Sequence, residues 1–156
     1  NDTIELDLSE SQPSILATLL HEMIPGNDFS TKFFEVEDIY LYIDSQVNPT
    51  KGTDKHMRMR GKLLMFIMLY GPVWSEEHKE FCRLFPIAGE AVTEIKKKHN
   101  PQNPSQKVHS NLSWILMNTE SEIMREVWRV LYDNRVHFLS IHDAILVEHH
   151  NLETGK

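Results

Sequence analysis

The chain has 156 residues, of which 40% are apolar and 25% are charged, close to the averages for globular proteins. This composition excludes a chain that is disordered throughout, and the length suits about one domain with a substantial core. The net charge of −7 argues against a protein that coats nucleic acid or binds membranes through a polybasic surface.

Positive charge is nevertheless concentrated in two short segments of this acidic chain. Residues 51–62 contain five lysine and arginine residues against one acidic residue, and a second basic run consists of Lys96, Lys97 and Lys98. We expect these segments to form local patches that meet a partner carrying negative charge at one place.

The sequence favours an intracellular, reducing compartment. A single cysteine, Cys82, excludes a disulfide framework, and we expect it to be a small buried residue rather than a nucleophile. The longest apolar run, Leu63–Tyr70, has eight residues, whereas a membrane-spanning helix needs about 20. The acidic start of the chain is not typical of a secretory signal. We therefore expect a cytoplasmic protein with no membrane partner and, because the chain opens without Met almost inside a strand, further elements upstream.

The first half of the chain is predicted to form a strand over 3–8 and helices over 13–23, 33–47 and 54–69. The strand shows alternating polar and apolar residues, and Pro13 suits the first turn of a helix. Pro25 and Gly26 break the first helix, and Gly71 with Pro72 ends the long one.

The second half is predicted to form helices that begin at Ser75 and at Pro86, one or two helices over 112–132, and strands over 136–141 and 144–148. Ser75 is a favourable N-cap, and the helix from Pro86 runs to about Lys98. The two strands flank His142 and Asp143, which makes a hairpin. A strand, many helices and a hairpin, in this order, predict an α+β fold with a small sheet.

Four residues with one spacing lie along the predicted long helix. Arg58, Lys62, Phe66 and Tyr70 follow one another at intervals of four, and Gly71 comes next. Residues four apart share a helical face, so two cations and two aromatic rings would form one ridge. Cations at the phosphates and rings at the sugar and base suit a nucleoside triphosphate. On spacing alone, a basic helix start that leads into a core helix is the simpler interpretation.

Two aspartates stand at the ends of predicted strands. Asp143, with His142, occupies the tip of the predicted hairpin, where a carboxylate is exposed and rigidly held, as a metal ligand must be. Asp7 ends the first strand, where an acid in an apolar pattern is costly unless it is paired, solvated or bound to metal. Each aspartate taken alone is explained more simply as an ordinary turn residue.

These patterns, in this order, resemble the three catalytic motifs of the family A DNA polymerases, the bacterial DNA polymerase I family. The first motif, D-Y-S-Q-x-E after a strand, stands here as residues 7–12 and ends at Gln12. The fingers-helix motif R-x-x-x-K-x-x-x-F-x-x-x-Y-G is matched at every fixed position. The V-H-D-E hairpin stands as residues 141–144, with Glu148 beyond it. Softer similarities at 38–40, 81–86 and 116–118 extend the resemblance over nearly the whole chain.

The resemblance implies a fold of the polymerase right-hand type, similar to the compact cores of phages or mobile elements. It implies an α+β core with a small antiparallel palm sheet and a mostly helical fingers region. The implied domains are palm over 1–32, fingers over 33–110, and palm again over 111–156, with no thumb or exonuclease in this chain.

The resemblance also implies an activity. This is a template-directed nucleotidyltransferase, most simply a DNA-directed DNA polymerase, which extends a primer 3′ end by phosphoryl transfer with two Mg²⁺ ions. The implied partners are primer-template nucleic acid, nucleoside triphosphates and further domains or subunits. The resemblance also implies the site residues. Asp7 and Asp143 would be the metal ligands, and Arg58 and Lys62 would bind the triphosphate, with Lys62 as proton donor to pyrophosphate. Phe66 and Tyr70 would lie at the sugar and base, Gln12 at the sugar, His142 at the primer terminus and Asn118 at the template or primer.

Two positions depart from the family pattern. Gln12 and Ala144 stand where the family has glutamates, which implies altered sugar discrimination and one carboxylate fewer in the site. Single-subunit phage-type RNA polymerases share much of the plan, although they tend to carry Met where this chain has Phe66. A non-catalytic nucleic-acid-binding remnant of a polymerase core is a further alternative, as is a helical interaction domain with coincidental motifs.

Overall fold

The computed structural model describes residues 3–7, 10–48, 52–102, 109–141 and 144–148. These residues form helices and a small antiparallel sheet, so the α+β class expected from the sequence is confirmed. The chain divides into two compact units, which we call the sheet unit (residues 1–11 and 118–156) and the helical unit (residues 12–117).

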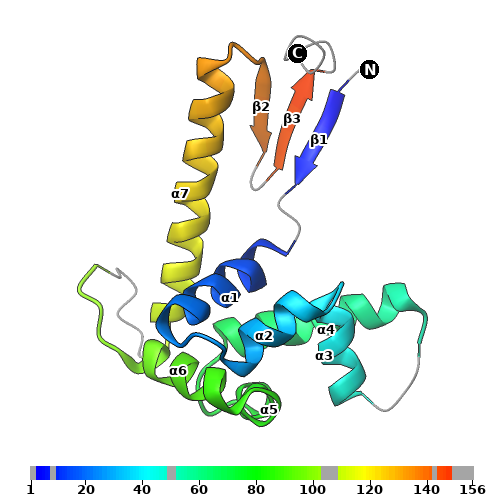
Figure 1. Ribbon diagram of the computed structural model, residues 1–156, viewed down its shortest axis with the longest axis vertical. Helices are drawn as coiled ribbons and strands as arrows, with labels where there is room; N and C mark the ends of the chain where they lie inside the picture. The colour runs from blue at the N-terminus through cyan, green and yellow to red at the C-terminus, as the bar shows by residue number, and fades with distance from the viewer. Residues whose placement is uncertain (1–2, 8–9, 49–51, 103–108, 142–143, 149–156) are drawn as a thin grey trace. The chain divides into compact units, whose positions relative to one another are not determined.

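The described residues of the sheet unit form three strands: β1 (Thr3–Asp7), β2 (Phe138–Ile141) and β3 (Ala144–Glu148). Their order is β1-β3-β2, and β3 pairs antiparallel with both neighbours (Figure 1). The hairpin predicted from the sequence therefore exists, although its first strand begins two residues later than expected, at Phe138.

One long helix, α7 (Asn111–Asp133), supplies the apolar partner of this sheet. Ile145 and Val147 of β3 are buried together with Met124 of α7, and partly buried apolar residues of α7, including Trp128, surround them. The alternate residues of β3, such as Leu146, are only partly buried. This alternation is typical of a strand with one face in the core.

In the helical unit, the part of the chain that the structure describes forms six further helices: α1 (Ser11–Met23), α2 (Asp28–Glu35), α3 (Ile39–Val47), α4 (Asp54–Tyr70), α5 (Glu76–Leu84) and α6 (Pro86–Lys97). Leu16, Phe29, Met65, Phe81 and Val92 are among the buried residues that these helices contribute to one shared apolar core. The predicted helices over 13–23 and 54–69 are confirmed, and their ends move by two residues or fewer.

The single helix expected over 33–47 is wrong, because the chain leaves the helical conformation between α2 and α3. Asp38 has an extended backbone, and its carboxylate accepts hydrogen bonds from the backbone N–H groups of Tyr40 (2.9 Å) and Leu41 (3.0 Å). This N-cap satisfies donors that a new helix would leave unpaired. Asn27 caps α2 in the same way, so each helix has its own start signal.

The limits of the two units differ from the expected domain limits. Residues 12–32 were expected in the first palm segment, but Leu16 and Phe29 are buried in the core of the helical unit. Residues 111–117 begin α7, and Leu112 and Leu116 are buried in that same core. The sheet unit therefore keeps only the first eleven residues and the part of the chain from Asn118 onward.

Helices α3 and α4 approach each other closely at Gly61. A Cβ atom added to Gly61 would lie 1.9 Å from the carbonyl oxygen of Tyr40, which is far inside van der Waals contact. Only the absence of a side chain allows the backbone of α3 to lie against α4 at this point. The basic first turns of α4 are thereby held against α3.

Candidate functional site

The four residues spaced along α4 lie on one continuous helix, as predicted, and we call them the α4 ridge (Arg58, Lys62, Phe66 and Tyr70). The rings of Phe66 and Tyr70 are stacked, with centroids 5.6 Å apart and an angle of 14° between their planes. The Nζ atom of Lys62, an exposed residue, lies 5.9 Å from the centroid of the Phe66 ring. A cation and two parallel rings therefore follow one another along the helix surface.

Arg58, at the start of the ridge, is engaged within the protein. Its Nε atom donates to Oδ2 of Asp38 at 2.5 Å, and its Cζ atom lies 5.2 Å from the centroid of the Tyr40 ring. Asp38 thus caps α3 with one carboxylate oxygen and binds α4 with the other. An incoming phosphate would compete with Asp38 for Arg58, so Lys62 is the cation of the ridge that a triphosphate reaches more readily.

The sequence analysis missed a second ion pair between α3 and α4. Arg60 donates from Nε and Nη2 to the two carboxylate oxygens of Asp44, at 3.0 and 2.7 Å, and Asp44 is fully buried. Asn48 donates to the same carboxylate at 2.6 Å. A planar guanidinium matches a carboxylate in this two-point geometry. Arg60 therefore serves the packing of the two helices and does not extend the ridge.

The strand register places the backbone of Asp7 opposite the residue that follows the other predicted metal ligand in the sequence. Asp7, the last residue of β1, pairs with Ala144, the first residue of β3, and Asp143 immediately precedes Ala144 in the sequence. Asp143 and His142 lie outside the described residues, and of Asp7 the structure describes the backbone. Because two metal ions in one site need carboxylates a few ångströms apart, we expect Asp7 and Asp143 to converge and the α4 ridge to face them, and both stay predictions.

The remaining predicted site residues have partners or positions of their own. Gln12 is buried, with 6% of its surface exposed, near the start of α1. Asn118 donates to Glu122 one turn further along α7, at 3.1 Å. Glu148 pairs in the backbone with Thr3 at the far end of the β1–β3 ladder.

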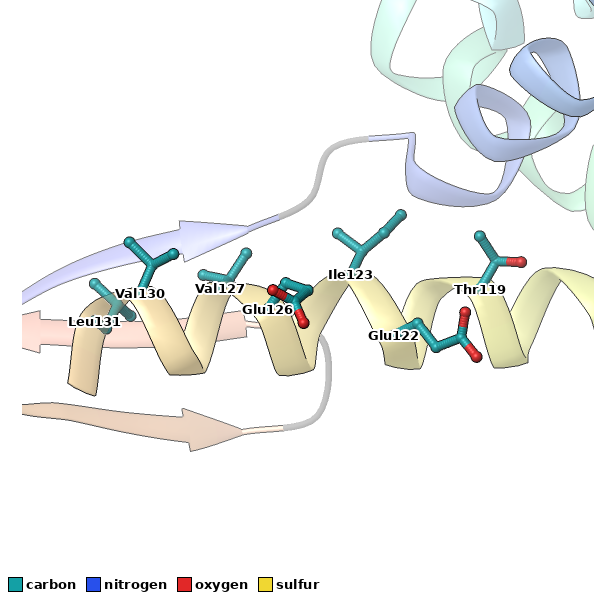
Figure 2. A pocket seen from close by; sticks show the side chains of 7 residues that line it. All are labelled: Thr119, Glu122, Ile123, Glu126, Val127, Val130 and Leu131. Atoms are coloured by element: carbon teal, nitrogen blue, oxygen red, sulfur yellow. The ribbon is translucent and has the colours of Figure 1, made fainter. Parts of the chain in front are cut away.

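Beyond Asn118, α7 carries a shallow groove of about 510 Å³. Figure 2 shows Ile123, Val127 and Val130 along one side of the helix, with Glu122 and Glu126 beside them. The apolar side chains and two carboxylates make this groove a poor surface for a phosphate backbone. If α7 contacts nucleic acid, the contact therefore involves a different part of this helix.

The donor set at the ends of β1 and β3 fits magnesium in its chemistry. Mg²⁺ prefers carboxylate oxygens and is commonly bound by one or two carboxylates together with waters and substrate phosphates. Asp7 ends β1 and pairs in the backbone with Ala144, and Asp143 is the residue before Ala144 in the sequence, so the two predicted ligands are both carboxylates. Among the described residues, no group of three histidine, cysteine, aspartate or glutamate side chains gathers into a metal site elsewhere.

Comparison of the chain with protein families, curated proteins and solved structures gives no match. No helix in the described part of the chain combines the length and the apolar character needed to cross a membrane.

Proposed function

We propose that the chain is the palm and fingers core of a template-directed nucleotidyltransferase, most simply a DNA-directed DNA polymerase. The α4 ridge carries this proposal, because a cation and two stacked rings follow one another along one helix. The pairing of Asp7 with Ala144 supports it independently, since it brings the backbone of Asp7 beside the residue that follows Asp143. In this proposal the sheet unit serves as the palm and the helical unit as the fingers of a right-hand fold.

The proposed chemistry depends on charge neutralisation and alignment. Phosphoryl transfer needs positioned positive charge more than it needs a covalent intermediate. Lys62 would bind the triphosphate and give a proton to the departing pyrophosphate, and Phe66 and Tyr70 would pack against the sugar and base. Two Mg²⁺ ions bound by Asp7 and Asp143 would supply activation of the primer 3′ hydroxyl and stabilisation of the leaving group. When the nucleotide binds, Arg58 would break its ion pair with Asp38 and donate to a phosphate oxygen instead.

A second function, favoured by two specific observations, is a non-catalytic module that binds nucleotides or nucleic acid. Ala144 stands where the resemblance implies a further carboxylate, and Arg58 is already paired with Asp38. Both observations would follow if the ridge bound nucleotides without turning them over. A single-subunit RNA polymerase is the nearest alternative within the enzyme class.

The test is extension of a labelled primer on a matched template by one nucleotide, with the full chain, Mg²⁺ and either dNTPs or rNTPs. We expect extension with dNTPs by the wild type and none by Asp143→Asn. Preference for rNTPs would instead identify an RNA polymerase. Binding of dNTPs by the wild type without extension would favour the non-catalytic module.

The variant Lys62→Ala tests the ridge itself. We expect it to reduce extension about 100-fold or more, because a positioned charge on a transition state contributes about that much. Lys79→Ala is the matched control, since Lys79 is an exposed lysine whose pair with Glu76 on α5 contributes little to stability. Circular dichroism should give the same fold for both variants, and equal extension by both would contradict the assignment of the ridge.

A further inference from the structure

Lys96 is fully buried, although its neighbours Lys97 and Lys98 are exposed. Its Nζ atom contacts the carbonyl oxygen of Met68 at 2.5 Å, the carbonyl oxygen of Gly71 at 2.9 Å and Nδ1 of His78 at 3.2 Å. A lysine ammonium has three N–H donors and no acceptor. All three donors therefore have a partner, which is the condition under which a charge can be buried.

The contact with Lys96 fixes the direction of a longer chain of hydrogen bonds. Because Lys96 can only donate, Nδ1 of His78 accepts and the ring proton is on Nε2, which lies 2.8 Å from Oγ1 of Thr93. The hydroxyl of Thr93 then donates to the carbonyl oxygen of Gly89 at 2.7 Å. Burial and the charge of Lys96 lower the pKa of His78 to about 4, which keeps the ring neutral. Burial lowers the pKa of Lys96 to about 8, so the ammonium stays mostly charged at neutral pH.

Cys82 lies beside this network of hydrogen bonds but does not form a nucleophile–base pair with His78. Its Sγ atom lies 3.7 Å from Nε2 of His78 and 3.9 Å from Oγ1 of Thr93. A base must have a free ring nitrogen to take the proton of a thiol. Both ring nitrogens of His78 are occupied, so the network is an anchor and not a catalytic dyad.

The end of α4 needs this anchor because of Pro72. In a helix, the carbonyl of Met68 would accept from the N–H of residue 72, and proline has no N–H to give. Lys96 supplies the missing donor and also binds the carbonyl of Gly71, just beyond the helix end. A cation at this position also meets the negative end of the helix dipole.

We propose that Lys96 is a positioning residue for the α4 ridge, holding the last turn of α4 so that Tyr70 stays stacked on Phe66 in the geometry proposed for nucleotide binding. This inference rests on the proposed function of the ridge. Tyr70 lies between the two residues whose carbonyls Lys96 binds, so loss of the ammonium frees the turn that carries its ring. Phe66 and Lys62 lie further from the helix end and should be disturbed less.

The main test compares Lys96→Met with the matched exposed control Lys98→Met in the full chain. For Lys96→Met we expect amide hydrogen exchange at Leu69, Tyr70 and Gly71 to become at least tenfold faster. The exchange rates of the amides in the middle of α1 should not change. We also expect at least tenfold weaker binding of dATP with Mg²⁺, measured by calorimetry. The double variant Lys96→Met/Pro72→Ala restores an N–H opposite Met68 and should recover part of both losses. A purely structural contribution would speed exchange and leave dATP binding as it is in Lys98→Met.

The outcomes separate this inference from the proposed function. If the wild type does not bind dATP, the proposed function fails, and the positioning role fails with it. If the wild type binds dATP and Lys96→Met binds it equally well, only the positioning role is overturned. Unchanged exchange in the last turn of α4 overturns it too. Should Lys96→Met fail to fold, ¹⁵N spectra of wild-type His78 still decide, because a proton on Nδ1 would contradict the anchor and a proton on Nε2 supports it.

Discussion

At the scale of single residues, the charged groups that are partly or fully buried in the helical unit serve the helix ends and helix contacts. Asp38 caps α3 and binds Arg58, Asp44 binds Arg60, and Lys96 binds the end of α4. Each pairs a charge with groups distant in sequence, since an unpaired buried charge would cost several kcal/mol. On α4, Arg58 and Arg60 thus hold α3 in place, whereas Lys62 faces solvent.

His78 makes the stability of the protein depend on pH. In the unfolded chain its pKa is about 6.5, whereas burial and the charge of Lys96 lower its pKa in the folded state to about 4. Between these values the unfolded state binds more protons, so stability falls as the pH is lowered from 6.5 to 4. We expect His78 to account for a loss of about 3 kcal/mol over this range. Urea unfolding at a series of pH values should give a flatter dependence for His78→Gln, and identical slopes would show that His78 does not titrate on unfolding.

Gln12 gives a prediction about the sugar of the substrate. The resemblance implies a glutamate at this position beside the ribose 2′-OH, and a neutral amide can pair with that hydroxyl as donor or acceptor. Weak rejection of ribonucleotides is therefore expected, and Gln12→Glu should strengthen it. The measurement is single-nucleotide extension with matched dNTP and rNTP on one primer-template. Because Gln12 is 6% exposed, the fold of the variant must be verified by circular dichroism. If Gln12→Glu rejects rNTPs no more strongly than the wild type does, another residue is responsible for discrimination at the sugar.

At the scale of elements, the packing of α3 on α4 fixes the helix that carries the ridge. The contact depends on the missing side chain of Gly61, and two ion pairs join the segments next to it, because Arg58 and Arg60, which precede Gly61 on α4, pair with Asp38 and Asp44. Helix α4 therefore has rigid support on one side while Lys62 remains exposed on another. This arrangement is the kind of scaffold on which a binding site keeps its geometry.

The variant Gly61→Ala tests that contact. A methyl group would meet the backbone of Tyr40 and force α3 and α4 apart, which should lower the free energy of unfolding by about 3 kcal/mol. Gly52→Ala is the control, because the nearest atom to a Cβ there is a side-chain atom of Met57 at 3.6 Å, an ordinary contact. The control should change stability by less than about 0.5 kcal/mol. Equal stability of the two variants in urea unfolding would show that the helices can separate at no cost.

At the scale of the whole molecule, the sequence predicts what local signals specify. Prolines, glycines and capping residues mark most helix ends, and the strands flanking His142 and Asp143 predict the hairpin. The break at Asp38 was missed because the apolar spacing of the flanking residues continues across it. Lys96 was missed because a run of three lysines is typical of a solvated surface, and its partners lie 18 to 28 residues away.

The candidate site is predictable in part for the same reason. Spacing of four along one helix is sufficient to predict that Phe66 and Tyr70 share one face, and the structure adds that their rings stack. No local pattern encodes the ion pair between Asp38 and Arg58, or the strand pairing of Asp7 with Ala144, which is far away in the sequence. Both contacts depend on tertiary packing, which a single sequence read residue by residue does not contain.

The strand order also determines when each unit can form during synthesis. Residues 12–117 are continuous, so the helical unit can fold as soon as it has left the ribosome. β1 emerges earlier than any of them, but in the described part of the chain the strand that pairs with it is β3. Until β3 has been translated, the edge of β1 that β3 covers is open to other chains, and closing so long a loop makes this pairing the slow step.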